Sequence, residues 1–174
     1  TGYIGRRLME QLLQLDHIEL RILVRNKNKV PIGISEQVEI YEGDTFNEEN
    51  LHLALQNIEM AYYLIHSMGS DEDYQKLDRL SAENFRNVCI EKKVKRVIYL
   101  GGLGVKESAS KHLLSRIETG EILSAFPDKL QTIWFRAGVI IGSGSASFEI
   151  IRNLVQKLPV MITPKWVRTK TQTI

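Results

Sequence analysis

Short apolar runs alternate with longer amphipathic stretches along most of this chain, and this alternation limits the possible fold more than any other feature. The expected strands are residues 18–24, 37–41, 58–65, 95–100 and 130–136. The expected helices are residues 47–56, 71–92, 110–126 and a segment that ends near residue 158. Strands that alternate with helices through short turns form a parallel sheet with helices on its faces. We therefore expect a single Rossmann-like, doubly wound α/β domain over residues 1–174.

The first residues have the pattern of the second half of a glycine-rich, phosphate-binding turn. Gly2 and Gly5 stand three positions apart, and leucines follow at helical spacing. Unpaired N–H groups at a helix N-terminus bind phosphate, and glycine lets the phosphate approach the backbone closely. We therefore expect Gly2, Tyr3, Ile4 and Gly5 to bind the pyrophosphate of a dinucleotide. Two glycines at an ordinary helix start are the alternative.

The strand that should precede this turn, and the first glycine of the dinucleotide fingerprint, are not part of the sequence. We expect a fragment in which the first strand of the sheet is missing. The C-terminal region that builds the substrate side of such folds is expected to be mostly absent as well.

The residue after the first expected strand favours NADP(H) over NAD(H). About twenty residues after the glycine turn, an acidic residue accepts a hydrogen bond from the 2′-hydroxyl of NAD, whereas arginine accommodates the 2′-phosphate of NADP. Arg25 stands at this place, Lys27 and Lys29 follow closely, and no acidic residue is present there. A basic, solvated loop over residues 26–35 is the alternative.

The next two strand ends supply further candidates for cofactor contacts. Asp44 and Thr45 follow the strand at 37–41, and Asp44 either reaches the adenine edge or caps the following helix. Ile65 and His66 end the strand at 58–65 and would pass beside the nicotinamide ribose. A lone histidine at a strand end is more often structural, so both interpretations of His66 stay open.

The composition excludes several classes of protein. The chain is 43% hydrophobic and 25% charged with a net charge of +2, which fits a soluble globular domain and does not suggest a nucleic-acid binder. Its single cysteine, Cys89, cannot form an internal disulfide, which favours a reducing cytoplasm, and core packing is its expected role. We find no signal peptide and no apolar run near the ~20 residues of a membrane helix. No metal site is expected.

With these residues assembled, the chain resembles the short-chain dehydrogenase/reductase superfamily, in particular its atypical branch of NAD(P)-binding, epimerase-like and nitrogen-regulator-like proteins. The segments that carry the resemblance are Thr1-Gly2-Tyr3-Ile4-Gly5, Val24-Arg25, Glu42-Gly43-Asp44 and residues 99–104, 110–116 and 136–142. The resemblance implies an NADP(H)-binding oxidoreductase or a nucleotide-sugar-epimerase-like enzyme. Members of this branch carry more chain on both sides.

The chain departs from the superfamily at its reactive residues. Active members use Tyr-x-x-x-Lys, in which the tyrosine exchanges a proton with the substrate while hydride moves. No such motif occurs here; His112 and Arg116 stand at the corresponding place and share one helical face. An imidazole titrates near neutral pH, so His112 is a candidate acid or base. Arg116 is a candidate for holding ribose hydroxyls or a phosphate, but it cannot supply a deprotonatable amine.

Other features keep a second function open. The serine or threonine that usually assists catalysis is replaced by Gly101 and Gly102, and Ser110 is expected to cap the following helix. The alternatives for His112 are a substrate-binding histidine and a buried histidine with satisfied hydrogen bonds. The alternative to an enzyme is therefore a catalytically silent NADP(H)-binding sensor, regulatory protein or assembly protein.

The late part of the chain offers weaker candidates for the substrate side. Residues 137–149 form a turn rich in small residues, where a second anion or substrate site is conceivable. Trp166 and Arg168 are candidates for a substrate pocket, although packing or surface roles are favoured. The sequence determines neither the substrate nor the oligomeric state.

Overall fold

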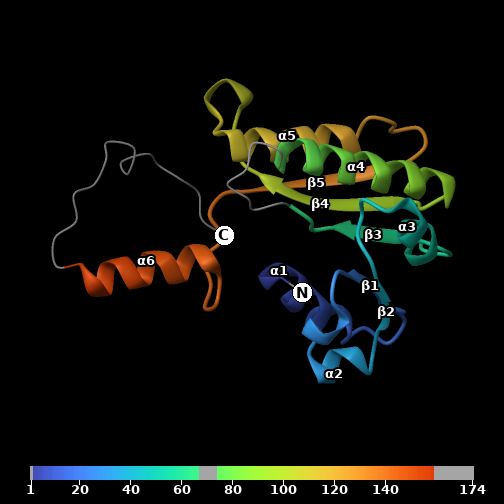
Figure 1. Ribbon diagram of the computed structural model, residues 1–174, viewed down its shortest axis with the longest axis horizontal. Helices are drawn as coiled ribbons and strands as arrows, with labels where there is room; N and C mark the ends of the chain where they lie inside the picture. Colours follow the sequence, from blue (N-terminus) through green and yellow to red (C-terminus); the bar gives the residue numbers. More distant parts are fainter. Residues whose placement is uncertain (1, 67–73, 159–174) are drawn as a thin grey trace.

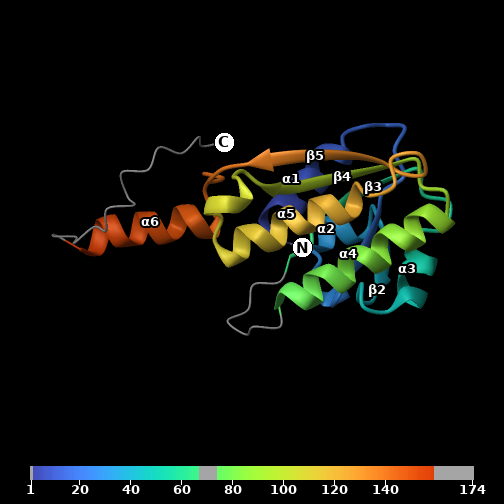
Figure 2. The same cartoon turned by 90° about the horizontal axis from the view of Figure 1, so that it is seen from above.

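The computed structural model describes residues 2–66 and 74–158, which form parallel strands covered by helices (Figures 1 and 2). The strands are β1 (Arg21–Val24), β2 (Glu39–Glu42), β3 (Met60–Tyr63), β4 (Arg96–Gly102) and β5 (Gln131–Ala137). The helices are α1 (Tyr3–Leu12), α2 (Ile32–Ser35), α3 (Glu48–Ala54), α4 (Tyr74–Glu91), α5 (Lys111–Leu123) and α6 (Ala146–Lys157), with 3₁₀ turns η1 (Lys27–Lys29) and η2 (Lys106–Ser108). The candidates Trp166 and Arg168 lie outside the described residues.

Every strand pair is parallel, which confirms the expected α/β class. The strands form two sheets, β1–β2 and β3–β4–β5, and β4 is central in the larger one. Among the described residues, no ladder joins β1 to β3. In a doubly wound sheet the first strand lies between these two neighbours, so the separation into two sheets agrees with the expectation that this strand is missing.

The strand β4 runs further than the sequence predicts. We expected a break at Gly101, but Gly101 pairs with Arg136 and Gly102 pairs with Ala137 in register with β5. The backbone N–H and C=O groups of glycine pair as well as those of any other residue. A Cβ on Gly102 would lie 2.5 Å from Cδ1 of Leu113 on α5. The two glycines therefore extend the strand and let α5 lie close above it.

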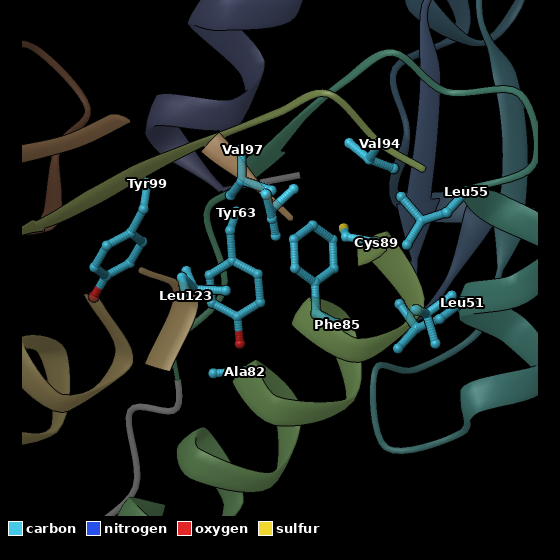
Figure 3. Packing of buried hydrophobic residues seen from close by; sticks show 12 residues of the cluster. Leu51, Leu55, Tyr63, Ala82, Phe85, Cys89, Val94, Val97, Tyr99 and Leu123 are labelled. Atoms are coloured by element: carbon cyan, nitrogen blue, oxygen red, sulfur yellow. The ribbon is translucent and has the colours of Figure 1, made fainter. Parts of the chain in front are cut away.

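The helices α4 and α5 lie side by side on one face of the larger sheet, and they form the main core with it (Figures 1 and 3). Tyr63 of β3 is central in this core, because its ring packs 4.9 Å from that of Phe85 and 6.0 Å from that of Tyr99. The buried members of the core are Leu51, Leu55, Tyr63, Ala82, Phe85, Val88, Cys89, Val94, Val97, Tyr99, Leu123 and Leu130. The expected packing role of Cys89 is confirmed.

A second, smaller core lies under β1 and corrects one prediction. Residues 26–35 were expected to be loop, but they contain η1 and α2. Val30 and Ile34 are buried there together with Met9 and Val24. Burial of these apolar side chains stabilises a short helix that is too short to form by its own propensity. Local composition alone therefore underestimated the order of this segment.

The helix α6 extends away from the sheets (Figure 1). Four of its apolar residues are exposed, namely Ile150, Ile151, Leu154 and Val155. Within residues 2–66 and 74–158, no helix combines the length and the hydrophobicity that crossing a membrane would require.

Candidate functional site

The N-terminus of α1 lies where the sequence expects pyrophosphate. Gly2 is the N-cap residue, has extended backbone angles, and provides no side chain to cap the helix. The N–H groups of the first turn therefore remain available to a ligand. A Cβ built on Gly5 would lie 3.9 Å from Leu64, just beyond β3. This contact places the first turn of α1 beside the carboxyl end of β3.

The glycine-rich segment before α6 closes over the same helix. Tyr3, Arg6, Arg7, Glu10, Ser143 and Gly144 line a recess of about 440 Å³. Nη2 of Arg7 donates to the carbonyl of Ser143 at 3.3 Å, and the guanidinium lies 4.8 Å from the centre of the Tyr3 ring. The tyrosine hydroxyl occupies the space that a Cβ on Gly142 would need. The expected turn at 137–149 thus packs on the glycine turn. 

A Cβ at position 142 would require the Tyr3 side chain to move. No role was predicted for Arg6 and Arg7, although two adjacent cations directly after Gly5 are visible in the sequence.

Arg25 lies at the carboxyl end of β1, as expected, and it is exposed. Lys27 pairs with Glu42 at 4.0 Å, and the side chain of Asn26 accepts from the N–H of Asn28 to begin η1. Within the part of the chain that the structure describes, no hydrogen bond or ion pair holds the side chain of Arg25. Its guanidinium can therefore approach an anion without breaking an internal contact.

Asp44 does not cap α3, so this alternative was wrong. Oδ1 of Asp44 accepts from the N–H of Phe46 at 3.2 Å, which closes a turn before the helix. The cap is Asn47, whose Oδ1 accepts from the N–H groups of Glu49 at 2.8 Å and Asn50 at 3.4 Å. Asn47 takes this role because it directly precedes the helix.

The side chain of Thr45 anchors the same loop to α4. Its hydroxyl is buried and lies 2.6 Å from Oγ of Ser81, which in turn lies 2.7 Å from the hydroxyl of Tyr63. Nδ2 of Asn84 donates to the carbonyl of Thr45 at 3.2 Å. The Thr45 hydroxyl is therefore committed to the core, and it fixes the position of the loop that carries Asp44.

His66 and His112 come together although they are far apart in the sequence. His66 follows β3 and Ile65, and His112 lies in the first turn of α5. Their ring centres are 6.1 Å apart in an edge-to-face arrangement, and the Tyr74 ring lies 6.4 Å from that of His112. Ser110 caps α5 by accepting from the N–H of Leu113, as expected. This cap fixes the turn that presents His112.

Arg116 lies against the end of β4. Its Nη2 donates to the carbonyl of Leu100 at 2.7 Å, and its own carbonyl accepts from the hydroxyl of Tyr99 at 2.8 Å. Nε of Arg116 is buried without a hydrogen-bond partner, and a Cβ on Gly102 would lie 3.7 Å from it. The positive charge of Arg116 therefore stays beside the carboxyl end of the central strand.

The charges around His66 favour its neutral form. Desolvation is the largest cause that lowers the pKa of His66, although the residue as a whole is exposed, and Arg116 and His112 lower it further. Asp78 acts in the opposite direction. Because Arg116 and His112 act in the same sense as desolvation, the neutral form of His66, which can accept a proton, is favoured. In the described ranges, no three metal-ligating side chains gather into a possible metal site.

Comparison with known proteins identifies the family. Residues 1–132 match the sequence model of a family described as NAD(P)H-binding. No curated protein matches the chain. Among solved structures, the Citrobacter sp. triphenylmethane reductase complexed with NADP(H) is 19% identical with a TM-score of 0.68, over 89% of this chain and 53% of that chain.

Two further structures show the same fold. The NADPH-dependent quinone oxidoreductase of Escherichia coli, complexed with NADPH, is 21% identical with a TM-score of 0.65, over 80% of this chain and 47% of that chain. MoeE5 in complex with UDP-glucose and NAD is 19% identical with a TM-score of 0.71, over 89% and 57%. The chain thus spans about half the length of the solved structures it matches. The chain belongs to the NAD(P)H-binding family, and its fold is the Rossmann-like fold that its resemblance to atypical short-chain dehydrogenases/reductases implies.

Proposed function

We propose that this chain is the NADP(H)-binding part of an oxidoreductase or nucleotide-sugar-epimerase-like enzyme. Gly2, Tyr3, Ile4 and Gly5 bind the pyrophosphate at the N-terminus of α1. Arg25 binds the 2′-phosphate. The adenine edge lies at the strand end that carries Asp44 and Thr45, where Thr45 acts by holding its loop. The nicotinamide ribose lies at the strand end that carries Ile65 and His66. His112 and Arg116 form the reactive end.

The observation that carries this proposal is the contact between Gly5 and Leu64. Their approach of 3.9 Å, measured to a Cβ built on Gly5, brings the phosphate-binding turn beside the segment that leads to His66. His66 faces His112 across 6.1 Å. A dinucleotide whose pyrophosphate lies on α1 would therefore extend toward the histidine pair. This direction agrees with the rule that ligands of open α/β sheets bind outside the carboxyl ends of the strands.

The preference for NADP(H) depends on Arg25. An exposed guanidinium without an internal partner can bind a 2′-phosphate through charge-assisted hydrogen bonds. The structural relatives include proteins complexed with NADP(H) or NADPH and one complexed with NAD, so they support a dinucleotide in general. The cationic strand end and the absence of an acidic residue favour the phosphorylated form.

NADP(H), when bound, supplies or accepts a hydride. In the proposed reaction, His112 exchanges a proton with the substrate oxygen. His66, held neutral by its surroundings, hydrogen-bonds the same group or the nicotinamide ribose. Arg116 keeps a positive charge beside the end of β4, where it stabilises negative charge that develops on the substrate oxygen.

The test of the cofactor assignment is a calorimetric titration of NADPH and, separately, of NADH into the full-length protein. We expect NADPH to bind at least about tenfold tighter, a difference of ~1.4 kcal/mol. The Arg25→Asp variant should lose this preference. Lys93→Asp is the matched control, because Lys93 is exposed in the turn at the amino end of β4, whereas Arg25 lies at the carboxyl end of β1, and the charge change is the same.

Two results would contradict the assignment. Equal affinities for NADPH and NADH in the unaltered protein would remove Arg25 as a specificity residue. If neither dinucleotide binds, the glycines of α1 are only a helix start, and the enzyme and the sensor interpretations fail together.

The alternative function, a catalytically silent NADP(H)-binding sensor, regulatory protein or assembly protein, is favoured by one observation. Arg116 donates to the carbonyl of Leu100, so this guanidinium is partly committed to the protein itself. The His112→Ala variant separates the two functions. Loss of turnover with unchanged NADPH affinity supports the enzyme, whereas absence of turnover across a panel of carbonyl and nucleotide-sugar substrates in the unaltered protein supports the sensor.

A further inference from the structure

A buried carboxylate joins the two helices behind the reactive end, and nothing in the proposed reaction uses it. Asp78 of α4 is only 5% exposed, and Ser115 of α5 is 2% exposed. Oγ of Ser115 donates to Oδ2 of Asp78 at 2.8 Å. Burying a carboxylate is costly unless hydrogen bonds or opposite charge compensate it. A carboxylate at this place therefore needs a reason beyond the packing of two helices.

The position of Ser115 connects this contact to the proposed site. Ser115 lies between His112 and Arg116 on α5, directly before Arg116 in the sequence. A hydrogen bond from Ser115 to α4 therefore fixes the rotation and height of the turn that presents both side chains. The contact of Nε2 of Gln75 with the carbonyl of Lys111, at 3.0 Å, holds the start of the same helix to α4.

The charge of Asp78 also acts on His66. Among the described residues, the charged and titratable groups that face His66 are Arg116 and His112 from α5 and Asp78 from α4. Asp78 is the one acidic group in this set, and it raises the pKa of His66, whereas Arg116 and His112 lower it. A buried negative charge acts through a medium of low dielectric constant, so its influence on a nearby imidazole is screened less than that of a surface carboxylate.

We propose that Asp78 is a positioning residue of the reactive end, which fixes the His112–Arg116 turn through Ser115 and balances the positive charge around the histidine pair. The inference rests on the proposed function only in taking His112 and Arg116 as the reactive end. It adds a residue on a different helix, and it predicts that the proton affinity of His66 depends on Asp78.

The experiment is an NMR titration of the histidine side chains in the full-length protein without cofactor. Asp78→Asn keeps the shape of the side chain and an oxygen that accepts from Ser115, but it removes the charge. We expect a downward shift of the His66 pKa, because the protonated imidazole loses an acidic neighbour that favours it. Ser115→Ala keeps the charge, so it should leave the His66 pKa near that of the unaltered protein while hydrogen exchange in the first turns of α5 becomes faster.

Ser81→Ala is the matched control. Ser81 is a buried hydroxyl on α4, close in sequence to Asp78, and it bonds Thr45 and Tyr63 instead of α5. This variant loses buried hydrogen bonds and should leave both the His66 pKa and the exchange of α5 unchanged. Asp78→Ser is a second neutral variant for the case that Asp78→Asn does not fold.

An unchanged His66 pKa in a folded neutral variant would overturn the proposal. Unfolding of both neutral variants would also overturn it, because it would assign Asp78 to stability alone. The titration is independent of cofactor binding. A shifted His66 pKa together with absent NADPH binding would therefore refute the proposed function and leave only the electrostatic coupling between Asp78 and His66 intact.

Discussion

Replacing Gly120 with alanine should destabilise the protein, although alanine is the better helix former. Gly120 is a buried residue of α5 that faces Trp134 on β5. A Cβ added there would lie 2.6 Å from Cδ2 of the indole and nearer still to Cε2 and Cζ2. These atoms belong to a rigid fused ring, so no rotation of a flexible side chain relieves the overlap. The indole or the whole helix must move.

The sign follows from two opposing magnitudes. Gly→Ala in a helix interior gains about 1 kcal/mol through propensity. Overpacking a well-filled core costs about 1–3 kcal/mol. The cost here belongs at the upper end of that range, because Trp134 also packs closely against Gly101, where an added Cβ would overlap its Nε1. The indole therefore has little room to move away from α5. We expect a net loss of about 1–2 kcal/mol in the free energy of unfolding.

The measurement is urea unfolding followed by tryptophan fluorescence and by circular dichroism. Gly33→Ala is the control, since Gly33 lies in α2 and a Cβ there would meet nothing within 4 Å. This control should be neutral or stabilising by up to about 1 kcal/mol. If Gly120→Ala were as stable as Gly33→Ala, the close packing of α5 on β5 would be refuted.

Two predictions concern titrating groups. The hydrogen bond from Arg21 holds the pKa of Glu39 below its usual 4.5, so the stabilising effect of this carboxylate is present above that pH and is lost as the pH falls through the lowered pKa. Arg21→Leu should return the pKa of Glu39 toward normal, and carboxyl NMR shifts against pH would show it; an unchanged midpoint would refute the pairing. Burial raises the pKa of Tyr99 to about 12, so stability should be complete below pH 10 and fall as the pH rises toward 12. Phenolate absorbance checks this, because a Tyr99→Phe variant should lose a tyrosine titration near pH 12.

The packing of α5 also explains how this chain departs from active short-chain dehydrogenases/reductases. The strand position that usually carries serine or threonine holds glycine here. A side chain on Gly102 would overlap Leu113, and one on Gly101 would overlap Trp134. The close packing of α5 on β4 lets Arg116 reach the end of the strand. The same packing leaves no space for a serine or threonine side chain at Gly101 and Gly102 unless Trp134 and Leu113 move.

The elements with strong local patterns were predictable, and those that depend on distant contacts were not. The long amphipathic helix α4 and the buried strand β4 follow from periodicity alone, within a few residues at their ends. The short helix α2 was missed, because the burial of Ile34 against Met9 stabilises it and no local signal reports that contact. Asp44 had two possible roles, a contact with the adenine edge or the cap of α3, and the observed cap at Asn47 excluded the second.

The sequence by itself determined the α/β class, the parallel order of strand and helix, the glycine turn and the cationic strand end at Arg25. These depend on local periodicity and on residue types at fixed spacing. Only the tertiary structure decided which groups meet: Gly5 beside Leu64, His66 opposite His112, and Asp78 bonded to Ser115. The members of each pair come from different elements, and the packing of helices on the sheet sets the distance between them. The chemistry of the site therefore depends on contacts that no local pattern encodes.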